Sequence, residues 1–248
     1  MIKKKSVWFL FFAMGLIALS ILFYFLHYIL FKDSHHIFIY LVGDIAFVPI
    51  EVLLVTLIIH KLLSVREKKA ILNKLNMVIG AFFSEIGSEL LRLFSDCDPD
   101  LTQLRKTLKV STEWSDKVFS TVQSKMKNYS FNVSISKVDL EKLKHYLQKR
   151  RNFLLRLLEN PNLLEHELFT ELLWAIFHLL EELLMRKDLK QLSHNDSIHI
   201  ENDIKRVYAL LLVEWLSYMN HLRKYYSYLF SLAIRMNPFD ENPTAEIR

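Results

Sequence analysis

The chain is poor in the residues that form turns and covalent cross-links. Glycine occurs 4 times and proline 5 times among 248 residues. A β-rich fold needs many tight turns, so this scarcity argues against one and favours long helices. The single cysteine, Cys97, excludes an intramolecular disulfide and is typical of a reducing compartment. Because Asp96 and Asp98 flank it, we expect an unreactive thiol with a raised pKa.

The chain also lacks the motifs of common catalytic and nucleotide-binding sites. It contains no GxGxxG, P-loop, nucleophile elbow or CxxC. His166 and Glu167 begin an HExxH pattern, but Thr170 stands where the second histidine is required. Basic residues are not interleaved with aromatic ones, as an RNA-binding sheet would need. We therefore expect no enzymatic activity, no cofactor and no nucleic-acid partner.

Two long apolar runs stand near the N-terminus. Residues 7–31 carry no charge, and residues 37–63 carry two carboxylates; each run is long enough to cross the hydrocarbon core of a bilayer. The first run is longer than the apolar core of a signal peptide and ends in bulky residues instead of a cleavage site. The sequence therefore predicts a transmembrane hairpin over residues 1–63.

Basic residues beside the two runs predict the topology. Lys3, Lys4 and Lys5 precede the first run, and Lys61, Arg66, Lys68 and Lys69 end or follow the second. By the positive-inside rule both flanks are cytosolic, and the polar link 32–36 lies outside. We expect a multi-pass protein of the inner (plasma) membrane with both termini in the cytosol. Lys61, Arg66, Lys68 and Lys69 are predicted to contact anionic lipid.

The second run holds two carboxylates, Asp44 and Glu51, with Pro49 between them. A spacing of seven residues places both acids on one helix face. In an antiparallel hairpin, Tyr24 falls level with Asp44, and Ser20 lies about one turn from Glu51, so their hydroxyls can hydrogen-bond the acids across the helices. Two helices cannot enclose two acids, so we expect protomers to associate over this face as a homo-oligomer.

The acid pair has three interpretations. It forms a hydrogen-bonded helix interface, or it lines a cation or proton path. In the third, the span begins near Ile45, so that Asp44 lies at the outer interface and Glu51 is only shallowly buried.

The rest of the chain is predicted to form a cytosolic α-helical domain over residues 64–236, a bundle of about five helices, followed by a flexible tail over 237–248. A helical pattern continues from the second run to Phe94, which suggests one uninterrupted helix. Further predicted helices are 98–128, one from a capping-box-like start at Ser136 to Glu159, 163–184, and about 200–236.

Two groups of polar residues are candidate metal ligands by residue type. Glu167, Glu171, His178 and Glu182 do not form the Glu-x-x-His pairs of a di-metal bundle site. His194, Asp196 and His199 lie in a polar segment that is more typical of a turn with a helix cap. We therefore predict no metal site.

Three stretches resemble a widespread prokaryotic family of two-span membrane proteins with a C-terminal cytosolic helical domain. They read VGDIAFVPIEVLLVTLIIHKLL, NKLNMVIGAFFSEIGSELLRLF and EWLSYMNHLRKYYSYLFSLAIRMNPFD. The resemblance covers most of the chain and implies an architecture without implying an activity.

The sequence as a whole favours an all-α membrane protein: a two-helix transmembrane hairpin followed by a cytosolic helical bundle. Its predicted role is a non-enzymatic membrane-anchored scaffold or sensor whose cytosolic helices engage a protein partner. The alternative is a small oligomeric cation or proton channel that uses Asp44 and Glu51.

Overall fold

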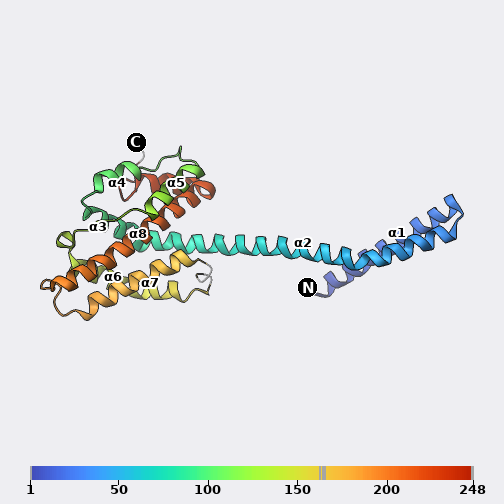
Figure 1. Cartoon of the computed structure of the whole chain (residues 1–248), viewed down its shortest axis with the longest axis horizontal. Coiled ribbons are helices and arrows are strands. Elements are labelled where there is room, and N and C mark those ends of the chain that lie inside the picture. The colour runs from blue at the N-terminus through green and yellow to red at the C-terminus, as the bar shows by residue number, and fades with distance from the viewer. Residues whose placement is uncertain (1, 162, 164–165, 247–248) are drawn as a thin grey trace. The chain divides into compact units, whose positions relative to one another are not determined.

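The computed structural model describes residues 2–161, 163 and 166–246, without the side chains of residues 2–10 and 68–73. Every regular element in this part of the chain is helical, so the predicted all-α class is confirmed. The chain divides into two compact units, residues 1–67 and 68–248 (Figure 1).

The first unit contains helix α1 (Ile2–Phe31) and the first part of helix α2 (Ser34–Phe82). Lys32 and Asp33 join them. Lys32 has a φ of 48°, and its amide donates to the Tyr28 carbonyl at 2.8 Å, which ends α1. The Asp33 carboxylate accepts from the His36 amide at 3.2 Å. The link is thus shorter than predicted, and His35 and His36 belong to the first turn of α2.

Helix α2 continues past Pro49 and past the end of the apolar run. The second run and the segment after it are therefore one continuous helix, a question that the sequence left open. Leu75, Ile79 and Phe82, near its C-terminal end, are fully buried in the second unit. One helix thus supplies both an apolar exposed segment and part of a packed core.

The second unit is a bundle built after α2. A π-helical turn (Phe83–Gly87) and a 3₁₀ turn (Ile135–Lys137) accompany seven helices in the described residues, more than the five expected. These are α3 (Ser88–Asp96), α4 (Leu101–Thr107), α5 (Asp116–Lys127), α6 (Leu140–Leu158), α7 (Glu167–Met185), α8 (His194–Tyr225) and α9 (Ser227–Arg235).

Two predicted helices are each divided in two. The one predicted over 98–128 breaks into α4 and α5, because the Leu108 and Val110 side chains in the connecting segment are buried in the core. The one predicted over 200–236 breaks at Tyr226, whose backbone leaves the helical region at φ −141° and ψ 66°. Neither break contains glycine or proline, so the sequence carried no strong signal for them.

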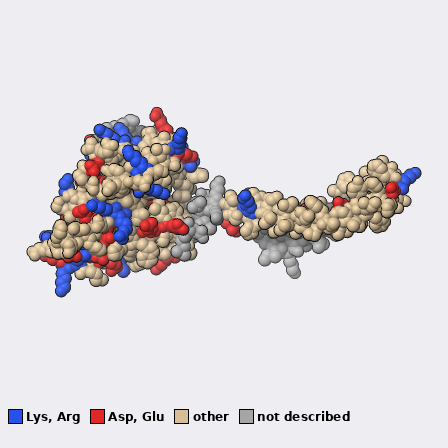
Figure 2. All heavy atoms as spheres, viewed as in Figure 1, with Lys and Arg blue, Asp and Glu red and all other residues tan. Residues whose placement is uncertain are grey.

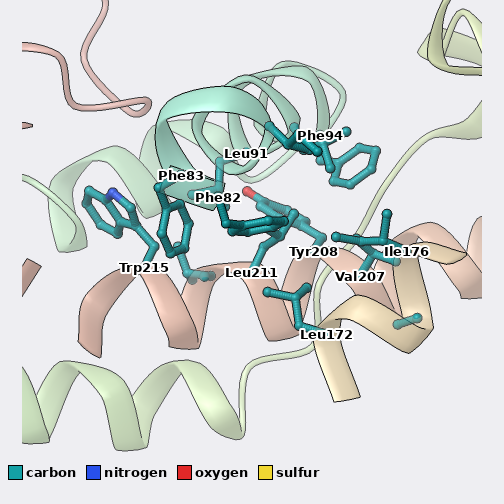
Figure 3. Packing of buried hydrophobic residues seen from close by; sticks show 14 of the residues in the cluster. Phe82, Phe83, Leu91, Phe94, Leu172, Ile176, Val207, Tyr208, Leu211 and Trp215 are labelled. Carbon is teal, nitrogen blue, oxygen red and sulfur yellow. The ribbon is translucent and has the colours of Figure 1, made fainter. Parts of the chain in front are cut away.

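Helix α8 is the centre of the second unit and contacts α3, α5, α7 and α9. Its buried face meets the end of α2, the π turn and α7 (Figure 3). The Phe82 ring packs edge-on against the Phe169 ring, with 5.2 Å between the ring centroids. The Phe94 and Tyr208 rings pack in the same way, with 6.1 Å between their centroids. Each such fully buried large side chain contributes roughly 1.5–3 kcal/mol to folding, so this aromatic core joins the elements around α8.

Packing against the core extends further toward the C-terminus than the sequence predicts. Asn237 and Phe239 are buried, and the Asn237 side-chain amide donates to the Leu108 carbonyl at 3.0 Å. Phe239 also meets the Trp215 ring edge-on at 5.5 Å. Packing therefore continues past residue 236, where the predicted tail begins.

Candidate functional site

The first unit contains a groove of about 1070 Å³ between α1 and α2. Its lining is mostly apolar but includes several polar side chains. Those from α1 are Ser20, Tyr24 and His27; Asp33 lies in the link; and those from α2 are His36, Tyr40 and Asp44. The groove is thus the place where the polar residues of the two apolar helices meet.

The structure brings together three of the four predicted intramembrane polar residues. Ser20, Tyr24 and Asp44 all line the groove. Glu51 is exposed and does not line it, so the two acids do not share this site. The predicted hydrogen bonds from Ser20 and Tyr24 to the acids are not formed among the described side chains.

The hydroxyl groups of Ser20 and Tyr24 and the Asp44 carboxylate line the same groove. In a bilayer an ionised carboxylate is costly unless it is paired, protonated or hydrated, and hydroxyls across a helix pair lower that cost. The His27 Nδ1 atom is enclosed and has no hydrogen-bond partner in the described part of the chain. The arrangement can therefore accept a polar or hydrogen-bonding group from a further helix or from water.

Of the four predicted lipid-contact residues, Lys61 and Arg66 are exposed on α2. The side chains of Lys68 and Lys69 lie outside the described residues. Charged side chains are frequent on the visible surface of the second unit and sparse on the apolar helices (Figure 2). The charge pattern of the sequence is thus retained at the surface of each unit.

A buried acid and a partly exposed imidazole form a close pair in the second unit. Glu214 of α8 is fully buried, with neither carboxylate oxygen hydrogen-bonded, and its Oε1 lies 3.6 Å from His166 Nε2. Burial raises the pKa of Glu214 to about 8, and burial lowers the pKa of His166. Both directions favour the neutral forms. His166 Nδ1 also accepts from the Phe169 amide at 3.2 Å, which makes it the N-cap of α7.

Cys97 is buried, and its Sγ donates to the Lys137 carbonyl at 3.4 Å. Burial, followed by the nearby Asp96, raises the pKa of the thiol. The raised pKa that the sequence predicted is confirmed, and burial is its larger cause.

Sequence reasoning missed one polar cluster. His178 and Glu182 of α7 face His199 and Asp203 of α8 across the helix pair. The signal was a histidine followed four residues later by a carboxylate, which occurs once in each helix. Asp196 is a candidate ligand in the sequence together with His199. In the structure its carboxylate instead accepts hydrogen bonds from Arg186 and from the cap residue Ser193.

Comparison with known proteins identifies relatives for both units. Residues 3–63 match the family model described as "MJ1433, N-terminal helical domain", and residues 71–235 match "Uncharacterized protein MJ1433, C-terminal helical domain". The protein MJ1433 of Methanocaldococcus jannaschii is 52% identical over 228 residues, which is 92% of each chain. No solved structure matches the chain. The two matches lie on either side of the division between the units, and the chain belongs to the MJ1433 family of proteins with N- and C-terminal helical domains.

Proposed function

We propose that this protein is an integral membrane scaffold or sensor, in which a two-helix hairpin anchors a cytosolic helical unit. The observation that carries the proposal is the exposure of the apolar helices. None of the side chains of residues 11–67 is buried, although 18-residue stretches within the segments 11–31 and 34–67 reach mean hydropathies of 2.1 and 2.3. Both are long and apolar enough to cross a membrane.

Lipid is the solvent that this surface fits. Apolar patches of more than a few hundred Å² are rare on monomeric soluble proteins. Here residues 11–31 of α1 and 34–67 of α2 expose Phe, Leu, Ile and Val around the helix circumference. Within each helix the backbone satisfies its own hydrogen bonds, which a spanning segment requires.

The continuity of α2 supports a role in transmission. The helix that carries Asp44 in the groove also carries Leu75 and Phe82 into the core of the second unit. A helix within a close-packed core cannot shift without repacking its neighbours. A change sensed in the bilayer would therefore reach the core around α8 through a single element.

The basic flanks support the cytosolic placement of the second unit. Lys61 and Arg66 are exposed at the end of the apolar part of α2. Basic residues close to the end of a spanning helix favour the cytosolic side of the membrane. They also fit the anionic surface of that leaflet.

The first experiment tests insertion and topology. A Cys97→Ala background carries one new cysteine, Ser34→Cys at the start of α2 or Gln191→Cys in the second unit. Intact cells are treated with a membrane-impermeant maleimide. We expect the protein to resist carbonate extraction, with labelling at residue 34 and none at residue 191 until lysis. Extraction into the soluble fraction, or the reverse labelling pattern, would overturn the proposal.

The second experiment tests the scaffold or sensor role. Native membranes are solubilised in mild detergent, and the tagged chain is recovered with whatever remains bound to it. We expect self-association or one reproducible cytosolic partner. Particles that contain a single chain and no other protein would remove this role and leave only a membrane anchor.

A cation or proton path is the second candidate, favoured by the position of Asp44 beside Ser20 and Tyr24 in the groove. Glu51, outside the groove, provides a matched control on the same helix. If a path exists, flux in proteoliposomes is lost in Asp44→Asn and retained in Glu51→Gln. Absence of flux in the unaltered protein, or equal flux in both variants, rejects this candidate.

A further inference from the structure

A cluster of two imidazoles and two carboxylates lies on the solvent side of the α7–α8 pair. His178 and Glu182 are one turn apart on α7, and His199 and Asp203 are one turn apart on α8. The two helices pack against each other, which brings the pairs face to face. The ligand atoms of His178, Glu182 and His199 all lie within 4.8 Å of one another.

The distances between the imidazole nitrogens and the carboxylate oxygens suit the spacing of ligands around one metal ion. Asp203 Oδ2 lies 3.4 Å from His178 Nε2 and 3.4 Å from His199 Nε2. Glu182 Oε2 lies 3.4 Å from His199 Nε2, and its Oε1 lies 3.9 Å from His178 Nε2. Nitrogen and oxygen ligands stand about 2.0–2.2 Å from tetrahedral zinc, so adjacent ligands are about 3.3–3.6 Å apart. Three of the four distances are in that range.

Asp203 supplies a second, independent observation. Its side chain is 3% exposed, and its Oδ2 has no hydrogen-bond partner in the described part of the chain. The two imidazole nitrogens approach this oxygen without hydrogen-bonding it. A buried carboxylate oxygen without a partner is costly in a folded protein. A cation between Asp203 and the two histidines would remove that cost.

Two arginines stand behind the carboxylates. Arg186 Nη1 donates to Glu182 Oε2 at 2.5 Å, and Arg206 Nη1 lies 3.6 Å from Asp203 Oδ1. The Arg186 hydrogen bond is the main reason that the pKa of Glu182 is lowered. Asp203 therefore has one oxygen near an arginine and one directed toward the histidines. In Glu182, the Oε2 atom that Arg186 binds also faces His199, and Oε1 faces His178. Such outer partners orient the ligands of metal sites.

We propose that His178, Glu182, His199 and Asp203 bind one divalent ion of the zinc type and so fasten α7 to α8. Two imidazoles with two carboxylates suit a borderline transition ion better than magnesium or calcium, which take oxygen ligands alone. Four protein ligands form a closed site, which is typical of structural zinc. The histidine side chains are 45% and 49% exposed, so the ion reaches the site from solvent.

The test uses the untagged full-length chain in nanodiscs, stripped of metal and titrated with Zn²⁺ at pH 7.5 against a chromophoric chelator. We expect one Zn²⁺ per chain and a rise in the thermal midpoint of about 5–10 °C at a free Zn²⁺ concentration of 100 Kd. Co²⁺ at the same site should give the intense visible absorption of a four-coordinate ion.

Two cluster variants and two control variants test the histidine ligands. His178→Ala and His199→Ala alter half-exposed side chains, so folding should survive while Zn²⁺ affinity falls at least 100-fold. His194→Ala and Glu201→Gln, both on α8 outside the cluster, should bind as the unaltered chain does. Stoichiometric binding that persists in the two cluster variants, or no Zn²⁺ binding by the unaltered chain, would overturn the proposal.

Discussion

Glu214 is the residue with the clearest energetic signature. Its carboxyl group has no hydrogen bond, and burial raises its pKa to about 8, whereas an unfolded chain ionises it near the ordinary pKa of 4.5. Between these values the folded state holds a proton that the unfolded state has released. The free energy of unfolding should therefore fall as pH rises from about 4.5 to about 8. The lowered pKa of His166 acts in the opposite direction below the ordinary imidazole value of 6.5, so the fall caused by Glu214 should be clearest between about 6.5 and 8.

We expect Glu214→Gln to be more stable than the unaltered chain at pH 9, by on the order of 4 kcal/mol. At pH 5 the two should agree within about 1 kcal/mol. Urea unfolding of detergent-solubilised protein, followed by circular dichroism at both pH values, measures the difference. Glu201→Gln, at a half-buried position on the same helix, serves as the control. Equal stability gains at both pH values would mean that Glu214 is ionised in the folded state.

Gly87 ends the π turn for a steric reason. A Cβ at this position would lie 2.6 Å from the Phe83 ring and 2.8 Å from the Phe82 ring. Both rings are buried in the core, so they cannot swing away. We expect Gly87→Ala to destabilise the second unit by about 1–3 kcal/mol, measured as a shift of the urea midpoint. Gly43→Ala, where a Cβ meets nothing within 4 Å, should leave that midpoint unchanged.

Helix α6 begins at a different residue from the one that the sequence pattern predicts. The sequence pattern places a capping box at Ser136, but the observed N-cap is Asp139, whose carboxylate accepts from the Lys142 amide at 2.9 Å. Asp139→Ala should therefore cost about 1 kcal/mol of stability, and Ser136→Ala should cost clearly less. Thermal unfolding of the two variants side by side decides between the starts. A larger loss in Ser136→Ala would favour the pattern.

Element identity was predictable, and element ends were less so. The repeat of Leu75, Ile79, Phe82 and Leu90 identified a buried helix face, because apolar spacing depends on the chain alone. The break near Leu108 involves a contact with a distant residue, the hydrogen bond from Asn237 to the Leu108 carbonyl. No local signal marks such contacts.

The same distinction explains the candidate sites. Tyr24 and Asp44 were predicted to lie level because a hairpin of two helices has few geometries, and both line the groove. The cluster that joins His178 to His199 was missed, because it requires knowing that α7 and α8 pack and in which register. Each pair, considered within its own helix, resembles an ordinary solvent-exposed contact.

At the scale of the whole molecule, the division after residue 67 gives the last prediction. The core of the second unit begins at Leu75, and the buried hydrophobic residues of the described chain all lie between it and Phe239. A chain of residues 68–248 therefore keeps its core while losing the exposed apolar helices. It should remain helical, unfold cooperatively and stay in the soluble fraction, whereas the full chain requires detergent.

Sedimentation after cell lysis and near-ultraviolet circular dichroism of the truncated chain measure this outcome. Fixed aromatic signals are expected, because Phe94 and Phe131 pack around Tyr208 without any residue from the first unit. Recovery of the truncated chain in aggregates, or loss of the aromatic signals with helicity retained, would contradict the prediction. Either result would mean that Leu75 and Phe82 pack in the core only when the part of α2 before Lys68 is present.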